Sequence, residues 1–207
     1  MSTDLQIMVN NLCEFYDFTD EVVLSVGAGG GQLYEYAFST WHVIAVDNDI
    51  NGIERLKESL LKEGILDTFT LVHSDFYDFK AEGDLLMFDY CLHEIPDPEK
   101  AIHHALTMSS RILINDHWPD SEWAYITNED VKVKRCWQAI EKFRIRKIQR
   151  YDTSQFFYDY EGLFQKVKNQ GNNSIERIKK YKGKKDFKIP MSYVFVLIER
   201  TDDEILD

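Results

Sequence analysis

The chain has 207 residues, of which 44% are hydrophobic and 14% aromatic, and its 36 acidic and 24 basic side chains give a net charge of −12. This composition excludes an intrinsically disordered chain, and the length favours one domain over two. The scattered cysteines exclude a disulfide scaffold, and no long apolar run or signal-peptide pattern occurs, so we expect a cytoplasmic protein with no membrane partner.

The first 20 residues predict an amphipathic helix. Its apolar side chains recur at helical spacing and are Leu5, Met8, Leu12, Phe15 and Tyr16. A helix placed before the first strand can cover a binding site or simply pack against the sheet. The sequence leaves both interpretations open.

Strands and helices alternate along the next part of the chain. Short apolar runs predict buried parallel strands, whereas apolar residues at helical spacing predict helices. The predicted strands are 21–26, 41–46, 69–73, 84–90 and 111–115. The predicted helices are 32–40, 51–62, which closes at Gly64, and 98–108, which begins after the N-cap Asp97.

The alternation changes after Pro119. We expect a helix over 129–143, a sixth strand over 144–151, a helical insertion over about 152–189 and a final strand over about 190–199. These elements predict an α/β fold, namely a doubly wound, mostly parallel, Rossmann-like sheet of about seven strands with helices on both faces. We predict a single domain over 1–207, composed of an N-terminal helical cover (1–20), a ligand-binding core (21–118) and a C-terminal part (119–207).

A glycine-rich turn, GAGGG, follows the first predicted strand. Glycine lets the backbone turn sharply and approach a ligand closely. Gly27, Gly29 and Gly31 fit a GxGxG pattern, whereas Gln32 breaks the dinucleotide fingerprint GxGxxG, and no GKS or GKT phosphate loop occurs. Asp47 ends the second strand 20 residues after Gly27, where a carboxylate can accept both hydroxyls of a ribose.

Five sequence blocks in order make the chain resemble the class I S-adenosylmethionine-dependent methyltransferases. The blocks are VLSVGAGGG, IAVDND, HSDFYDF, GDLLMFDYCLHEIPDPEKAI and RILINDHW, between about residues 21 and 116. The stretch LHEIPDPEKA is most similar to family members that act on small molecules. The resemblance implies S-adenosylmethionine as cofactor, S-adenosylhomocysteine as product and 21–118 as the cofactor-binding core.

The resemblance also implies roles for individual residues. Gly27, Gly29 and Gly31 would face the amino-acid portion and ribose of the cofactor, and Asp47, with Asn48 beside it, would bind the ribose hydroxyls. Asp75 would contact the adenine amino group, Phe76 the adenine face, and Tyr90 and Cys91 the methionine side. Asp47 could instead cap the following helix, Asp75 could be only a turn residue, and Phe76 could belong to the core.

Two features depart from the family pattern. The family usually has an acidic residue two positions before the first glycine, but this chain has Ser25, so the methionine amino group would be held differently or by water. The Gly-Gly turn usual before the fifth strand is replaced by residues 108–110, Met-Ser-Ser, which affects the fold more than the chemistry.

Two histidines at predicted strand ends are candidate catalytic residues. Methyl transfer from a sulfonium needs alignment and exclusion of water, and an acceptor that starts protonated can use a general base. His93 and His117 suit that role, although His93 could instead fix its loop. With Glu94 and Asp116 they form a possible metal set, but no ligand-spacing motif supports one and we predict no metal site.

Charge divides unevenly along the chain. Residues 1–130 contain 25 acidic and 6 basic side chains, whereas residues 131–207 contain 11 acidic and 18 basic ones. The basic part is either a solvated face or a surface for an anionic polymer.

The most favoured function is therefore methylation of a small molecule. Methylation of RNA or protein guided by the basic part is an alternative, with a nucleic-acid partner possible but not favoured. Cofactor binding without transfer, and another reaction on the same fold such as aminopropyl transfer or a cyclisation, are the others.

Overall fold

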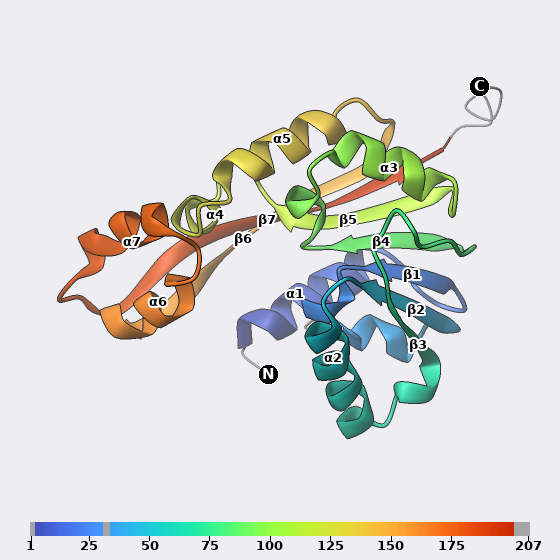
Figure 1. The fold of residues 1–207 in the computed structure, drawn as a ribbon, viewed down its shortest axis with the longest axis horizontal. Helices are drawn as coiled ribbons and strands as arrows, with labels where there is room; N and C mark the ends of the chain where they lie inside the picture. Colours follow the sequence, from blue (N-terminus) through green and yellow to red (C-terminus); the bar gives the residue numbers. More distant parts are fainter. Residues whose placement is uncertain (1–2, 31–33, 201–207) are drawn as a thin grey trace.

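The computed structural model describes residues 3–30 and 34–200, and within them the strands form one seven-stranded sheet (Figure 1). The strand order is β3-β2-β1-β4-β5-β7-β6. Pairing is parallel from β3 to β5, and β7 runs antiparallel to both β5 and β6. The predicted doubly wound, mostly parallel sheet is confirmed.

The strands are β1 Val22–Val26, β2 His42–Asp47, β3 Phe69–His73, β4 Leu85–Asp89, β5 Arg111–His117, β6 Ile145–Asp159 and β7 Lys185–Glu199. The α-helices are α1 Thr3–Phe15, α2 Ile50–Glu63, α3 Pro98–Leu106, α4 Glu122–Ile126, α5 Asp130–Ile140, α6 Tyr160–Val167 and α7 Asn172–Ile178. Short 3-10 helices are η1 Ala28–Gly30, η2 Tyr34–Phe38, η3 Leu66–Thr68, η4 Leu92–Glu94 and η5 Lys179–Tyr181.

Helices cover both faces of the sheet because each face presents an apolar layer. Leu12 of α1 and Leu60 of α2 belong to the core on one face, together with side chains of β1 and β7. Ile102 of α3 and Cys136 of α5 belong to the core on the other face. Figure 1 shows α3 and α5 together on their side of the sheet. No helix among the described residues is long and apolar enough to cross a bilayer.

The order of the strands reverses between β1 and β4. After β3 the chain returns past β1 to build β4 and β5 on the other side. In an open sheet of this kind, ligands bind beyond the carboxyl ends of the strands at the reversal point. The segments after Val26 and Asp89 are therefore brought together, and a binding site is expected between them.

Local sequence fixes the helix ends near this edge. The Asp49 side chain accepts a hydrogen bond from the Asn51 N–H and caps α2, which ends at Gly64 with φ of 73°. Asp97 caps α3 by accepting from the Lys100 N–H. Gly64 and Asp97 are the predicted ends, whereas the Asp49 cap was not predicted.

Two predicted helical segments are wrong in extent. In place of the helix expected over 32–40, the described part of that stretch forms only the 3-10 helix η2, in which Tyr36 and Ala37 are buried. Residues 32 and 33 lie outside the described residues. The ring of Tyr36 packs against Phe18 with 4.9 Å between centroids, so core contacts shape this short connection.

The helical insertion predicted over 152–189 is much shorter. β6 and β7 continue beyond the main sheet as an antiparallel ribbon that pairs as far as Asp159 and Lys185. Only α6, α7 and η5 lie between them, at the tip of the ribbon and far from α2 (Figure 1). The ribbon residues of β6 are mostly polar and partly exposed, so they lack the apolar run that identified the inner strands. Helix α4 was not predicted.

Helix α1 packs against the sheet through fully or largely buried side chains. Leu12 is 0% exposed, and the Asn11 side-chain amide donates to the Tyr193 hydroxyl at 2.7 Å. The predicted amphipathic helix is confirmed, and its apolar side packs against the sheet.

Truncation of Leu12 tests how much this packing contributes. Leu12→Ala should lower the free energy of unfolding by about 2–5 kcal/mol, because it leaves a cavity under α1. Ile7→Ala, on the exposed side of the same helix, should change it by less than about 0.5 kcal/mol. Urea unfolding measures both, and equal losses would contradict the packing described.

Candidate functional site

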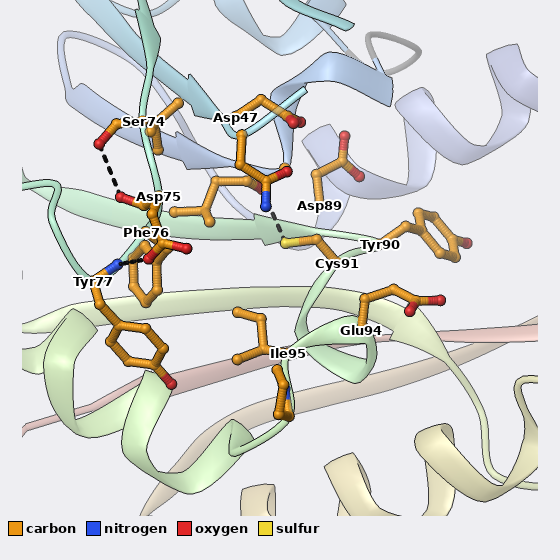
Figure 2. Close-up of a pocket in the computed structure, with 15 residues that line it drawn as sticks. Asp47, Ser74, Asp75, Phe76, Tyr77, Asp89, Tyr90, Cys91, Glu94 and Ile95 are labelled. Carbon is orange, nitrogen blue, oxygen red and sulfur yellow. Dashed lines mark hydrogen bonds between the residues drawn. The ribbon is translucent and has the colours of Figure 1, made fainter. Parts of the chain in front are cut away.

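A pocket of about 400 Å³ opens at the carboxyl edge of the sheet, where the strand order reverses (Figure 2). Seven of the residues predicted to bind the cofactor line it, namely Gly27, Asp47, Asn48, Asp75, Phe76, Tyr90 and Cys91. Figure 2 shows Asp75, Phe76 and Tyr77 at one end, and Tyr90, Cys91 and Glu94 at the other. Gly31 lies outside the described residues.

The glycine turn needs its glycines for two different reasons. Gly27 has φ of 77°, and a Cβ there would lie 2.5 Å from the Cβ of Cys91. A Cβ on Gly29 would lie 2.7 Å from a carboxylate oxygen of Asp47. Side chains are therefore excluded by backbone conformation at the first position and by close contact at the second.

Asp47 ties the glycine turn to the end of β2. Its Oδ2 accepts a hydrogen bond from the Gly29 N–H at 2.7 Å, and its Oδ1 accepts one from the Asp49 N–H at 2.8 Å. Each carboxylate oxygen has a second acceptor position, so ribose hydroxyls can still bind. The N-cap of α2 is Asp49, and the alternative reading of Asp47 as that cap is not supported.

Asp75 and Phe76 each have the structural role that the sequence left open, and both also line the pocket. Asp75 Oδ1 accepts from the Tyr77 N–H at 2.8 Å and so holds a turn, while the residue also lines the pocket. Phe76 is 9% exposed and packs edge-on against Phe88 and His104. It is part of the core and forms a wall of the pocket.

Tyr90 adopts a backbone conformation that is uncommon outside glycine. Its φ is 51°, and its hydroxyl is buried without a hydrogen-bond partner in the described part of the chain. Strained residues of this kind gather at functional sites.

Cys91 next to it is not activated. Burial raises the pKa of the Cys91 thiol well above its usual value, and Asp116, Asp89 and Asp47 raise it further. The thiol stays protonated and is a wall of the pocket, since a nucleophile requires the thiolate.

His93 forms a tight buried pair with Asp116. The distance from His93 Nδ1 to Asp116 Oδ1 is 2.6 Å, and the His93 N–H donates to the other carboxylate oxygen. Burial lowers the pKa of His93, but the Asp116 charge and hydrogen bond, assisted by Glu94, outweigh it and raise the pKa to about 10. His93 therefore holds its proton near neutral pH. This state does not suit the predicted general base, and we assign His93 to positioning its loop.

His117 has the opposite protonation state. Burial lowers its pKa to about 4; the Asp116 carboxylate raises it, and the positive His93 lowers it again. Its Nε2 lies 3.7 Å from a carboxylate oxygen of Glu129, and its buried Nδ1 has no hydrogen-bond partner among the described residues. A neutral His117 with its proton on Nε2 thus offers Nδ1 as an acceptor.

The closest metal-like cluster differs from the set considered in the sequence. Ligand atoms of His93, Glu94 and Glu129 lie within 4.8 Å of one another, without Asp116 or His117. Lys132 pairs with Glu94 at 2.5 Å, and Asp116 pairs with His93. Because these internal pairs already balance the cluster, we assign no metal to it.

A second cavity of about 450 Å³ adjoins the first and shares Tyr90 and Glu94 with it. Its wall also includes His93, His117 and Glu129. Distant segments complete it, with Leu5 and Met8 from α1, Trp123 from α4, and Lys166 and Gln170 from the ribbon tip. The N-terminal helix thus forms part of the wall of this cavity. No sequence pattern pointed to Glu129, Trp123 or Lys166, because only the fold brings them together.

Some of the basic side chains of the C-terminal part form ion pairs with acidic neighbours. Lys180 pairs with Glu122 at 2.8 Å and Lys179 with Glu176 at 2.5 Å. The positive charge of this part is therefore partly balanced within the molecule.

Known proteins resemble the chain in sequence over its core and in structure over almost its whole length. A sequence model of the methyltransferase domain family matches residues 24–110. No curated protein sequence matches the chain.

Solved structures share the fold at low sequence identity. A candidate methyltransferase from Bacillus halodurans has a TM-score of 0.68 and 12% identity, with 96% of this chain and 99% of that chain covered. The YcgJ protein from Bacillus subtilis has a TM-score of 0.67 and 13% identity, with 95% and 98% covered. The [4+2]-cyclase SpnF has a TM-score of 0.64 and 10% identity, with 94% and 80% covered. At these identities the likeness concerns the fold alone.

Replacement of Asp47 tests the pocket. Asp47→Ala should weaken binding of S-adenosylhomocysteine by roughly 10- to 100-fold, because the ribose hydroxyls and the Gly29 N–H lose a charged acceptor. Asp49→Ala removes the cap of α2 and an exposed ion pair with Arg55, both outside the pocket, and should leave the affinity close to that of the wild type. Calorimetric titration measures both, and an unchanged affinity of Asp47→Ala would refute the ribose assignment.

The His93–Asp116 pair predicts a pH-dependent stability. The folded pKa of His93, about 10, lies above the unfolded value of about 6.5, so the contribution of the pair is complete below pH ~6.5 and is lost as the pH rises towards 10. His93→Gln should therefore cost about 3–5 kcal/mol near pH 6 and less at pH 10. Denaturant unfolding at both pH values, with the exposed His103→Gln as control, measures this, and a cost independent of pH would contradict it.

Proposed function

We propose that this chain, whose residues 24–110 match the methyltransferase domain family, methylates a small-molecule acceptor held in the second cavity. The observation that carries the proposal is the junction of the two cavities at Tyr90 and Glu94. S-adenosylmethionine supplies a methyl group made electrophilic by the positive sulfur.

The residues of the first pocket fit this cofactor in chemistry and order. Asp75 and Phe76 offer an acceptor and a ring at the end assigned to adenine, and Asp47 offers the carboxylate for the ribose. Tyr90 and Cys91 close the methionine end beside the second cavity. This order directs the methionine end, where the transferable methyl is carried, towards the second cavity.

The second cavity has the size for a small acceptor. Its volume of about 450 Å³ is within the range of small-molecule sites, and side chains of α1, α4 and the ribbon tip form part of its wall. These side chains can hold an acceptor atom in line with the methyl group, and a bound acceptor displaces water from that position.

His117 is the proposed catalytic residue in this arrangement. Its unpaired Nδ1 can accept the hydrogen bond of an acceptor hydroxyl or amine, and Tyr90, with 5.1 Å between ring centroids, packs against it. As the acceptor atom forms its bond to the methyl carbon, the bond between that carbon and the sulfur would break and release neutral S-adenosylhomocysteine, and the acceptor proton would pass to Nδ1. A base with a pKa of about 4 suffices for an oxygen acceptor, because a hydroxyl oxygen that gains a methyl group becomes strongly acidic.

Polymer methylation is less well supported. The basic side chains of the C-terminal part lie mainly on the ribbon tip and on α5, and Lys132, Lys179 and Lys180 among them pair with carboxylates. An RNA substrate would need a groove lined by basic residues, whereas among the described residues the wall of the first pocket has no lysine or arginine and that of the second cavity has Lys166 alone.

Turnover by two variants tests the proposal. With an acceptor found by screening small amines, alcohols and phenols for S-adenosylhomocysteine release, His117→Ala should lower kcat/KM by about 10²- to 10⁴-fold while cofactor affinity stays the same. His103→Ala, an exposed histidine on α3, should retain wild-type turnover.

Two results would contradict the proposed function. The first is methylation of RNA or protein, but of no small molecule, with binding of the polymer that weakens as salt rises. The second is tight cofactor binding with no turnover on any acceptor, which would indicate a binding protein without transferase activity.

A further inference from the structure

Asp89 ends β4 inside the cofactor pocket and has no assigned role. Figure 2 shows it beside Tyr90 and Cys91, at the methionine end. Its backbone carbonyl lies against the glycine turn, since a Cβ on Gly27 would be 3.3 Å from that oxygen. The side chain of Asp89 is therefore near the place where the amino-acid portion of the cofactor is expected.

The charge of Asp89 lacks a positive partner. Its Oδ1 accepts a hydrogen bond from the Asn115 side-chain amide at 2.9 Å, and no ion pair involves it within residues 3–30 and 34–200. Burial raises the pKa of Asp89 to about 6; the Asn115 hydrogen bond lowers it, and the nearby Asp116 charge raises it. A desolvated carboxylate without a cation is costly, so a positively charged ligand group is favoured there.

Ser25 occupies the position at which an acidic side chain was expected. In the sheet, Ser25 pairs with Met87, two residues before Asp89, and side chains two apart on a strand share a face. Ser25, Tyr36 and Asp89 also line one small adjoining cavity. Asp89 thus lies on the same face as Ser25 and closer to the carboxyl edge.

We infer that Asp89 binds the α-ammonium group of the cofactor and supplies the carboxylate that Ser25 does not provide. Asn115, on the neighbouring strand β5, fixes the orientation of that carboxylate through its amide. The inference rests on the cofactor and is independent of the acceptor proposed above.

Two ligands that differ only in the ammonium group test the inference. The first is S-adenosylhomocysteine, whose sulfur is neutral, so its ammonium is its one cationic group. The second is the same molecule with hydrogen in place of the α-ammonium. Calorimetric titration of the whole chain gives the ratio of the two dissociation constants. We expect a ratio of roughly 10- to 100-fold in the wild type.

Asp89→Asn should reduce that ratio to about 2-fold or less, mainly by weakening S-adenosylhomocysteine. The asparagine oxygen can still accept from Asn115, so the fold is preserved, which circular dichroism checks. Asp75→Asn, at the adenine end, is the matched control and should leave the ratio at the wild-type value. The double variant that carries both Ser25→Asp and Asp89→Asn should regain part of the wild-type ratio.

Two results would overturn the inference. The first is a wild type that binds both ligands equally, and the second is an Asp89→Asn variant that keeps the wild-type ratio, either with unchanged affinities or with both ligands weakened by the same factor. Neither bears on the nature of the acceptor, which turnover of small molecules tests separately.

Discussion

One charge-assisted hydrogen bond, from the Gly29 N–H to the Asp47 carboxylate, joins the ends of β1 and β2 and sets the geometry of the site. It forms because Gly29 has no side chain to occupy the space that the carboxylate fills. The close approach of Gly29 and Gly52 at the start of α2 extends the same constraint, since a Cβ on Gly52 would be 2.9 Å from Gly29 Cα. Strand ends, turn and helix are therefore fixed together before any ligand binds.

Near this hydrogen bond, the carboxyl edge of the sheet has more acidic than basic side chains. Asp47, Asp75 and Asp89 line the first pocket, and Glu94 lies where it meets the second. A cofactor with a positive sulfur and an ammonium group suits such an edge. Charge also makes the two histidines differ in protonation state. Asp116 holds a proton on His93, and the positive charge of His93 helps to keep His117 neutral.

Elements with a strong local signal could be predicted from the sequence. β1, β2 and β4 are continuous apolar runs, and α2 and α3 carry recognisable caps, so the core of the fold and seven pocket residues followed from them. The outer part of the β6–β7 ribbon was not predicted as strand. Its residues in β6 are mostly polar, and the two strands are held by pairing with each other. Asp89 lies at the carboxyl end of β4, as Asp47 lies at the carboxyl end of β2. A carboxylate in this position is a candidate for ligand binding in both strands.

The roles of the histidines could not be read from residue type. His93 and His117 both follow strands that end at the site, yet one is paired with a carboxylate and the other is desolvated without such a bond. Which neighbour each ring meets depends on η4 packing against β5, a long-range contact without a local sequence signature. Protonation, and with it the choice of base, is a property of the assembled fold.

The ribbon formed by β6 and β7 gives the molecule a modular architecture. The tip that it carries contributes Lys166 and Gln170 to the second cavity but none of the residues that line the first. Changes in the length or sequence of this tip can therefore alter the second cavity while the residues that line the first pocket stay the same. If the second cavity holds the acceptor, as proposed, substrate preference can change without a change in cofactor binding.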